Sequence, residues 1–499
     1  MSAPTGFPVV LTAPRTLMAP YRLLFDGILA CNQTTRTPRP LANALLMPRP
    51  RSDALRAPVA PLGLRRIEAA LVRDGFGVDE VAVVAGHRLP DAVGPATRVI
   101  GLTVGDPLGL GMSTTTSAAI TGGRPLTARA HTELLGRIEQ AVGRSGSPAA
   151  IIAGGPGAWQ LEQSASDSVD HIVTGCADGN AADVVRAVAD GEAQPRVIAG
   201  RGAAAEDIPA VLGPTTMAAV ETSRGCELGC SFCTLAHVPM EHLPESTITA
   251  DICTNLNAGQ RDVCLVSEDL FRYGAQGAAP DPAALIALLE RLRRFDGLGM
   301  IQTDHANLLS VSQFSDDELR TVRRLMVGDT GQEMPWLNVG VETAAGELLR
   351  ANGGGAKMGP CPDDEWAALA SRELRRLITA GFFPLASLVV ALPGETGEQV
   401  RRTREWAESL ADERLAIFPV LYAPTDGSPA LRGRDLSREQ WTLIRACYRI
   451  NFRWIPRMYA DSQRAAGVPA ARRLLMQALG RGQAAVWRAQ LAIRTRGNR

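Results

Sequence analysis

Three closely spaced cysteines constrain this chain more than any other feature of its sequence. Cys226, Cys230 and Cys233 form a C-x3-C-x2-C pattern that begins a few residues after a short apolar stretch, residues 217–220. This spacing can place three thiolates around one metal centre while leaving a fourth coordination position free. Because an incomplete ligand set admits another ligand, the pattern predicts a metal centre that binds a substrate or a cofactor directly.

A structural zinc site is the alternative interpretation of the same residues. His237 follows Cys233 at C-x3-H spacing, and quartets of Cys and His hold zinc in many small modules. Such modules usually lack a core of their own, whereas this loop lies within a long alternation of predicted strands and helices. We therefore favour an iron-sulfur centre, with His237 in a supporting or structural role.

Composition narrows the functional classes. The 499 residues are enough for two or three domains, and 45% hydrophobic with 21% charged residues is ordinary for a globular protein. Lys plus Arg and Asp plus Glu both total 52, so no overall field favours nucleic acid or an anionic membrane. No segment has the pattern of a signal peptide or of a membrane span, so we expect a cytoplasmic protein.

The remaining cysteines do not suggest a disulfide framework. Of the nine cysteines, six are scattered outside the cluster, at Cys31, Cys176, Cys253, Cys264, Cys361 and Cys447. Scattered cysteines of this kind are typical of a reducing compartment, which also suits an oxygen-sensitive cluster.

Residues 1–205 are predicted to form one α/β domain. Short β-rich runs occur at residues 8–13, 80–85, 98–104, 149–153 and 171–174. Helical patterns separate these runs, one of them at residues 131–142. The alternation predicts a parallel, doubly wound, Rossmann-like sheet. Ligands bind beyond the carboxyl ends of such strands, which directs attention to the loops at residues 105–116 and 154–159.

A second unit, residues 206–430, alternates in the same way. Its strand candidates lie at residues 217–223, 262–267, 300–303, 336–341, 384–392 and 415–422. Its helical patterns lie at residues 248–258, 282–295, 316–326, 364–380 and 398–410. Loops at the carboxyl ends of barrel strands build active sites, and the cysteines fall at such an end. Residues 431–499 are predicted to be a helical domain that caps the barrel or helps to close over substrate.

The cysteine pattern, with the aromatic Phe232 before its last cysteine, resembles the cluster loop of radical S-adenosylmethionine (SAM) enzymes. The six strand-helix units are similar to the partial (β/α)6 barrel of that family. The resemblance implies that Cys226, Cys230 and Cys233 hold a 4Fe-4S cluster, whose spare iron is chelated by the amino and carboxylate groups of SAM. It further implies a separate electron donor, such as flavodoxin or ferredoxin.

The first domain resembles the cobalamin-binding domain that precedes many radical SAM cores. Four segments carry this resemblance, at residues 61–64, 106–116, 154–156 and 169–175. It implies a bound cobalamin, contacted by Asp106, Gly109, Ser113, Gly154 and Gly155. The Asp-x-His-x-x-Gly string that donates a histidine to cobalt in some of these domains is absent, and His87 does not fit it. A domain that keeps the fold without the cofactor is therefore the alternative.

Strand ends of the second unit resemble the SAM contacts of the family. The residues implied to bind this cofactor are Phe232, Ser267, Asp269, Glu342, Thr343, Pro393 and Gly394. Glu268 and His305 also follow strand ends, and they are the candidate catalytic groups, either accepting the SAM ammonium or moving a proton. The competing interpretations are structural, since acidic residues at strand ends often cap the next helix and most histidines in such places are structural.

The commonest activity among proteins with both resemblances is methyl transfer from SAM, via cobalamin, to an unactivated carbon of a small molecule. A cyclase or ring-rearranging enzyme, which includes cyclisation of SAM to an aminocyclopropane product, is the enzymatic alternative. A zinc-stabilised binding protein is the non-enzymatic one. The methylthiotransferase branch is disfavoured, because neither its second three-cysteine domain nor its RNA-binding barrel is apparent. We therefore expect a small-molecule substrate and no nucleic acid.

Overall fold

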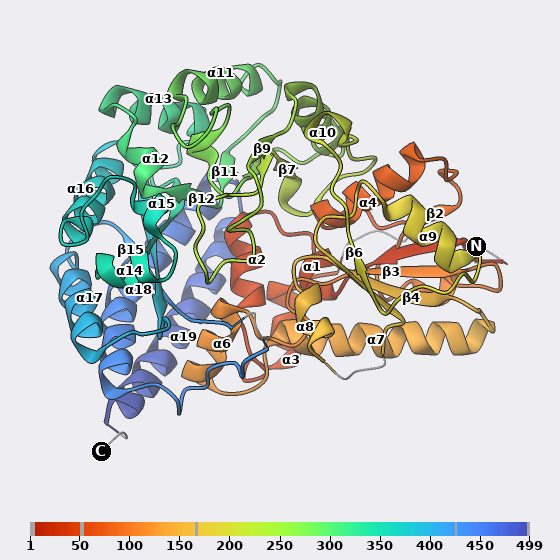
Figure 1. The fold of residues 1–499 in the computed structure, drawn as a ribbon, viewed down its shortest axis with the longest axis horizontal. Coiled ribbons are helices and arrows are strands. Elements are labelled where there is room, and N and C mark those ends of the chain that lie inside the picture. Colours follow the sequence, from red (N-terminus) through yellow and green to blue (C-terminus); the bar gives the residue numbers. More distant parts are fainter. Residues whose placement is uncertain (1–4, 50–53, 165–167, 425–426, 497–499) are drawn as a thin grey trace.

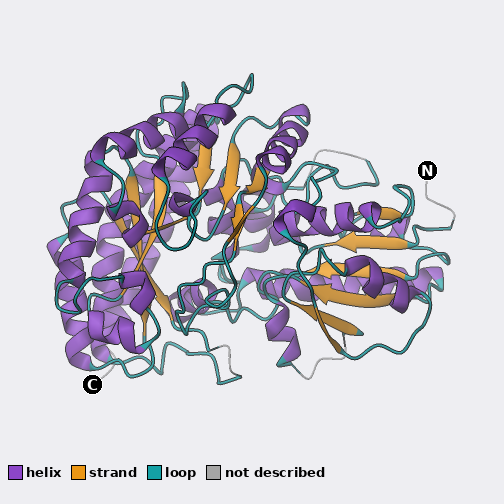
Figure 2. Ribbon diagram, turned by 45° about the horizontal axis from the view of Figure 1, so that its top comes forward, coloured by secondary structure: helices purple, strands orange, loops and turns teal. Residues whose placement is uncertain are grey.

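The computed structural model describes residues 5–49, 54–164, 168–424 and 427–496. Two α/β units lie side by side, and long helices from the C-terminal end of the chain cover part of the second unit (Figure 1). In both units the strands are flanked by helices (Figure 2). Within the described ranges, no helix combines the length and the apolar character that a membrane crossing needs.

The first unit is a six-stranded sheet with the order β2-β1-β3-β4-β5-β6 and only parallel pairs. Its strands are β1 (Val9–Thr12), β2 (Val81–Val83), β3 (Val99–Thr103), β4 (Ala150–Gly154), β5 (His171–Thr174) and β6 (Val197–Ala199). The sequence predicted the first five; β6 escaped prediction because three residues at a half-exposed edge carry too little pattern. The strand order reverses between β1 and β3, so the space beyond their carboxyl ends is the topological switch point.

Helices cover both faces of this sheet. Val9 and Leu11 of β1 belong to a core shared with α4, whereas Val10 belongs to a second core shared with α7. The helices of this unit are α4 (Leu62–Arg73), α5 (Leu89–Ala92), α6 (Met112–Thr121), α7 (Leu126–Ser145), α8 (Ala158–Glu162) and α9 (Ala181–Ala189). Two cores on opposite faces confirm the predicted doubly wound, Rossmann-like arrangement.

The second unit is a partial barrel of parallel strands. One of its sheets contains β7 (Ala219–Glu221), β10 (Val263–Val266) and β11 (Ile301–Thr303), and the other contains β12 (His305–Asn307), β13 (Trp336–Glu342), β14 (Phe383–Val390) and β15 (Ala416–Leu421). Only Asp304 separates β11 from β12, so the seven pieces occupy six strand positions, as predicted. β7 and β15 end the series, and no pairing joins them in the part of the chain that is described.

The helices of the barrel lie between successive strands. They are α10 (Glu245–Asn257), α11 (Pro282–Leu292), α12 (Leu308–Ser312), α13 (Asp316–Val327), α14 (Gly346–Ala351), α15 (Gly355–Met358), α16 (Trp366–Thr379) and α17 (Gly397–Ser409). The five long helices match the predicted ranges within a few residues. The short ones, α12, α14 and α15, were not predicted, because a single turn has no periodicity to detect.

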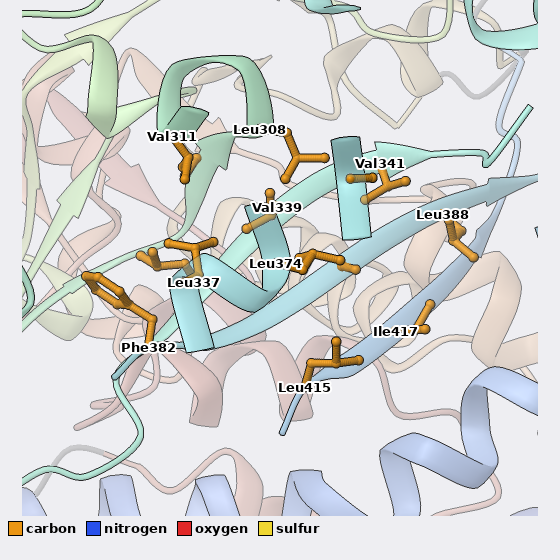
Figure 3. Close-up of a cluster of buried hydrophobic side chains, with 14 of the residues drawn as sticks. Leu308, Val311, Leu337, Val339, Val341, Leu374, Phe382, Leu388, Leu415 and Ile417 are labelled. Carbon is orange, nitrogen blue, oxygen red and sulfur yellow. The ribbon is translucent and has the colours of Figure 1, made fainter. Parts of the chain in front are cut away.

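Alternation along β13 separates the outside of the barrel from its interior. Leu337, Val339 and Val341 lie in the apolar core with side chains of α12 and α16 (Figure 3). Successive side chains of a strand point to opposite faces, so Asn338 and Glu342 face the interior. The functional side chains of the barrel are therefore expected at these alternate positions.

The two C-terminal helices, α18 (Arg438–Ala465) and α19 (Ala470–Arg496), pack against each other. The side chain of Asn451 in α18 donates to the Ile417 carbonyl (2.7 Å) and accepts from the Ile417 amide (2.8 Å), which ties this helix to β15. From the other side, the Leu421 amide of β15 donates to the Thr116 hydroxyl of α6 (2.8 Å). The terminal strand of the barrel is thus covered rather than free.

An N-terminal segment reaches from the first unit into the second. It contains α1 (Arg15–Met18), α2 (Leu24–Cys31), α3 (Arg39–Leu41) and the π-helix η1 (Ala42–Leu46). Phe25 of α2 packs edge-on against Trp336 at the start of β13, with ring centroids 5.9 Å apart. The segment between β1 and β2 therefore forms part of the interface between the two units.

A network of buried ion pairs also joins the two units. Arg66 of α4 contacts Asp251 of α10 (2.7 Å) and Glu221 of β7 (3.4 Å). Arg224 contacts Glu221 (2.9 Å) and Asp178, which follows β5 (3.0 Å). None of these side chains is more than 15% exposed. A buried charge that loses its partner costs several kcal/mol, so a shift of the two units that separated these pairs would be unfavourable. The network therefore holds the first unit against β7, the strand that leads into the cysteine loop.

Candidate active site

The cysteine loop lies between two short antiparallel strands, β8 (Ser223–Arg224) and β9 (Glu241–His242), directly after β7. The Cys226 amide closes it by donating to the Val238 carbonyl (3.0 Å). Gly225 has a φ of +81°, and a Cβ atom there would collide with the Pro239 carbonyl. Only glycine fits this position. The loop is therefore a defined element at the carboxyl end of β7.

The three thiols of the loop share one electrostatic environment. Burial raises the pKa of each of them, and that of Cys230 to about 11. The ammonium of Lys357 acts in the opposite direction on all three. Cys230 also lies near enough to Cys226 and Cys233 for their charges to affect its pKa. A metal centre that binds here must displace the thiol protons.

The thiols do not form a preformed site for a single ion. Among the residues that the structure describes, no three His, Cys, Asp or Glu side chains form a group that could hold a metal ion. A tetrahedral zinc would require sulfur atoms about 3.8 Å apart. His237, the fourth ligand of the zinc interpretation, is exposed. A four-iron cluster makes a different demand, because each thiolate bonds a separate iron atom and the sulfurs stand farther apart.

A buried ion pair lies next to the cysteines. Glu342 ends β13 with a φ of +65°, where the register with β14 shifts, and its carboxylate pairs with the ammonium of Lys357 in α15. The two side chains are only 9% and 11% exposed. Burial lowers the pKa of Lys357, but the Glu342 carboxylate and the thiols of Cys230 and Cys226 together outweigh burial, so the pKa is raised. The pair therefore carries both charges into the barrel beneath the cysteine loop.

The sequence analysis missed Lys357, although a signal was present. It is the only lysine of the chain, and the other 51 basic residues are arginines. A chain that uses arginine everywhere else has a lysine at the one position where a compact ammonium meets a buried carboxylate and three thiols. Counting residue types would have singled it out.

Three polar residues follow β10. Two of them, Ser267 and Asp269, are buried and hydrogen-bonded within the protein, whereas Glu268 is only half-buried. The Asp269 carboxylate is buried and accepts from the Ser310 hydroxyl (2.5 Å) and from the Phe271 and Asn307 amides (3.2 Å each). Burial raises its pKa to about 6. Ser267 is likewise buried, with its hydroxyl 2.5 Å from that of Ser223. The helix-cap interpretation thus describes Asp269, which caps the short helix η4 (Leu270–Arg272).

Glu268 is the available acid of this segment. Its side chain is half-buried, and burial raises its pKa while His305 lowers it. His305 lies at the break between β11 and β12, with Nδ1 3.4 Å from a carboxylate oxygen of Asp304, and both side chains are about 40% exposed. The structure therefore brings the two candidate catalytic groups, Glu268 and His305, into one cluster of titratable side chains with Asp304.

Four other predicted cofactor contacts have structural roles or lie at the surface. Phe232 is buried in the barrel core, and Thr343 is buried with its hydroxyl 3.0 Å from that of Thr403. Pro393 and Gly394 form an exposed turn after β14. Asn352 connects this turn to the cysteine loop. Its side-chain amide donates to the Pro393 carbonyl (3.1 Å), and its backbone carbonyl accepts from the Ser231 amide (3.0 Å). Their role in binding SAM stays a prediction.

A cavity of about 530 Å³ lies where the two units meet. Pro14 and Thr16 follow β1 and Gly105 follows β3, so the cavity occupies the switch point of the first sheet. Asn338 and Ser387 line it from inside the barrel. Glu342 lies four residues beyond Asn338 on the same strand, about 13 Å farther along. The switch point and the cysteine loop thus lie at the two ends of one barrel interior.

Among the predicted cobalamin contacts, Asp106 and Ser113 line this cavity. The Asp106 carboxylate accepts from the Gly111 amide (3.0 Å), the Thr114 hydroxyl (2.5 Å) and the Gln160 side-chain amide (2.7 Å). It therefore shapes the loop after β3 and holds the N-terminus of α6 in place.

The three predicted glycines are not among the residues that line the cavity. Gly109 (φ +74°) and Gly155 (φ +102°) have left-handed backbones packed against Pro125 and Thr103, where a Cβ atom would come within 2.6 Å. Gly154 ends β4 beside Val173. They allow backbone segments to approach closely, and a direct contact with cobalamin stays a prediction.

His131 of α7 also lines the cavity and was not singled out from the sequence. It is 3% exposed, and its Nδ1 has no hydrogen-bond partner among the described residues. Burial lowers its pKa to about 4, so that the imidazole is neutral. It was missed because it begins a predicted helix, at residues 131–142, where nothing local in the sequence marks a cavity.

Comparisons with known proteins bear on this arrangement. No protein-family model matches the chain. It is 26% identical over 271 residues to the ribosomal protein uS12 methylthiotransferase RimO of Anaeromyxobacter sp. (strain Fw109-5), covering 52% of each chain. It is 25% identical over 219 residues to the RimO of Desulforamulus reducens, covering 44% of this chain and 45% of that one. The chain spans about half the length of the curated relatives it matches.

Solved structures match over a larger part of the chain. The radical S-adenosylmethionine methyltransferase TsrM of Kitasatospora setae, with cobalamin and a [4Fe-4S] cluster bound, matches with a TM-score of 0.51 and 15% identity, over 83% of this chain and 72% of that one. The same enzyme with tryptophan substrate and a SAM analogue bound matches with a TM-score of 0.52, over 84% and 75%. The chain therefore shares the fold of this enzyme over most of its length.

Proposed function

We propose that this chain is a cobalamin-dependent radical SAM enzyme that transfers a methyl group from SAM to an unactivated carbon of a small molecule. One observation carries the proposal: a C-x3-C-x2-C loop lies at one end of a barrel interior whose other end opens onto the switch point of a Rossmann-like sheet. The likeness to TsrM, a radical SAM methyltransferase whose structure contains both a cluster and cobalamin, supports the cofactors and the SAM chemistry. The likeness to the methylthiotransferase RimO supports a group-transfer enzyme.

The residues present fit a cluster and SAM. Cys226, Cys230 and Cys233 would hold the cluster, and their nearness to Lys357 favours the thiolate form that iron requires. The charges of Lys357 and Glu342 complement the carboxylate and the ammonium of SAM. SAM carries both charges in its amino-acid part, and this buried pair places one cation and one anion beside the thiols that would hold the cluster.

The cavity at the switch point lies where a bound corrin would meet the barrel interior. Asp106 shapes the loop at its floor, and His131 presents a neutral, unpartnered imidazole. When bound, the cluster, SAM and cobalamin supply electron transfer and a carrier for the methyl group. The chain itself would supply orientation, through the buried charges of Lys357 and Glu342, and proton movement at Glu268 and His305.

Anaerobic reconstitution with iron, sulfide and hydroxocobalamin tests the proposal. We expect a brown protein that retains about one cluster and stoichiometric corrin. With methyl-deuterated SAM, a reductant and a candidate substrate, mass spectrometry should find the labelled methyl group on carbon. Cys230→Ala should lose the cluster, whereas Cys253→Ala, which changes a cysteine outside the loop, should keep it. A colourless protein with stoichiometric zinc would overturn the proposal in favour of the zinc-stabilised alternative.

The products separate methyl transfer from the cyclase alternative. A labelled methyl group on an added substrate supports transfer, while an aminocyclopropane product or a rearranged ring without label supports cyclisation or rearrangement. Flavodoxin or ferredoxin in place of the chemical reductant tests the proposed electron donor.

A further inference from the structure

A second cavity, of about 580 Å³, lies along the terminal strand of the barrel, β15. Its walls come from α2, η1, α6, β15, α18 and α19. It is lined by six aromatic side chains, those of Phe25, Phe418, Tyr448, Phe452, Tyr459 and Trp487. Its volume lies within the range of small-molecule sites, and the C-terminal helices supply much of its wall.

This cavity adjoins the one at the switch point. Six residues line both cavities, namely Phe25, Ile28, Asn32, Ser113, Phe418 and Val420. β15 ends the series of barrel strands, so the second cavity lies at the side on which the barrel is open. A molecule bound there would therefore contact side chains that also line the switch-point cavity.

The residues that line this cavity disfavour a positively charged ligand. Arg36 is the one charged residue among the described residues that line the cavity, and it is exposed, so no carboxylate is present to compensate a positive charge. Burying an unpaired cation costs several kcal/mol. Two amide oxygens in the wall, Oδ1 of Asn32 and Oε1 of Gln490, are buried without a hydrogen-bond partner. They are acceptors that a ligand with N–H or O–H groups would satisfy.

We propose that this second cavity binds the substrate, and that the substrate presents to it an uncharged, predominantly apolar ring system that carries at least one hydrogen-bond donor. The assignment as a substrate site rests on the proposed function, because that function would take place in the adjoining switch-point cavity. The binding properties of the cavity follow from its lining alone and can be measured without turnover.

The neutral fluorescent probe N-phenyl-1-naphthylamine, an aromatic amine with one N–H donor, tests the binding site on the full chain. We expect saturable fluorescence enhancement with one site. Ala484→Trp in α19 fills the cavity and should weaken binding at least about tenfold. Ala485→Trp, on the same helix but outside the cavity lining and exposed, should leave the affinity within about twofold. Equal losses in both variants, or none in either, would overturn the site.

Charge selectivity is tested with two competitors of the same shape. N-ethyl-1-naphthylamine is neutral and should displace the probe. N-(1-naphthyl)ethylenediamine carries a positive charge and should displace it at least about tenfold less well, because the lining offers no anion. Equal displacement would overturn the assigned ligand class.

Two further measurements keep the proposal testable if Ala484→Trp fails to fold. Trp487→Phe should reduce energy transfer from tryptophan to the bound probe, whereas Trp159→Phe in the first unit should not; no difference between them would place the probe elsewhere. Saturating hydroxocobalamin should leave probe binding intact. Displacement of the probe by the corrin would assign this cavity to cobalamin and overturn the proposal. Probe binding in a protein that retains no corrin would contradict the proposed function while leaving the cavity assignment standing.

Discussion

The ion pair between Lys357 and Glu342 is the part of the barrel interior whose loss should cost most. Its side chains are 11% and 9% exposed, so neither charge is well solvated. Removing one partner of a buried pair leaves the other charge uncompensated, which costs about 3–5 kcal/mol. Replacing both with neutral side chains of similar size removes that penalty. The double variant should therefore lose less than about 1 kcal/mol.

Urea unfolding of the cluster-free protein, followed by tryptophan fluorescence and circular dichroism, measures these losses. We expect Lys357→Met and Glu342→Gln each to lower the free energy of unfolding by about 3–5 kcal/mol, and Lys357→Met/Glu342→Gln to recover most of it. Lys357→Arg keeps the charge and should fall between wild type and Lys357→Met. Single variants within about 1 kcal/mol of wild type, or a double loss equal to the sum of the single losses, would refute the reasoning.

Three further predictions concern pH, the thiols and the interface between the units. The Asp269 carboxyl has a pKa of about 6 in the folded chain, above the usual 3.8, so it contributes stability below pH 4 that is lost as the pH rises through 6. Asp269→Asn should flatten this part of the stability profile, and an unchanged slope would contradict the assignment. Because Lys357 lowers the pKa of the cluster-loop thiols, Lys357→Met should slow their alkylation by iodoacetamide at pH 9; mass spectrometry finding equal rates would count against this contact. Arg66→Ala should destabilise the protein by about 3–5 kcal/mol in urea unfolding, since it leaves Asp251 buried and unpaired. Arg39→Ala, at an exposed pair, should stay within about 0.5 kcal/mol, and similar losses in both variants would argue against a buried network.

The sequence predicted most of the architecture because local patterns encode it. Apolar runs such as residues 98–104 and 384–392 became β3 and β14, and the long helices carry periodic faces that fix their extent. Alternation of strands and helices predicted that the strands would be parallel, but the order of the strands in the sheets appears only in the structure. β6 and the break at Asp304 lay beyond prediction, because three-residue strands depend on their neighbours more than on their own composition.

The sequence identified those candidate site residues that lie close together in one segment or directly after a predicted strand. The cysteine spacing is local, and so was the placement of Glu268 and His305 after strands. The pairing of Lys357 with Glu342, the cavity contact of His131 and the packing of Phe25 against the barrel join segments that only the folded chain brings together. For Asp269 the sequence predicted a contact with SAM, whereas in the structure its carboxylate caps the helix η4.

The proposed function requires a cluster held by Cys226, Cys230 and Cys233, and Mössbauer spectroscopy of the protein reconstituted anaerobically with ⁵⁷Fe measures this cluster directly. We predict the signal of a 4Fe-4S cluster with about four iron and four sulfide per chain, which SAM perturbs at one iron site. The variant with all three cysteines replaced by alanine should show no cluster signal. Wild-type protein that binds no sulfide, or a cluster signal that survives in the triple variant, would contradict the proposed function.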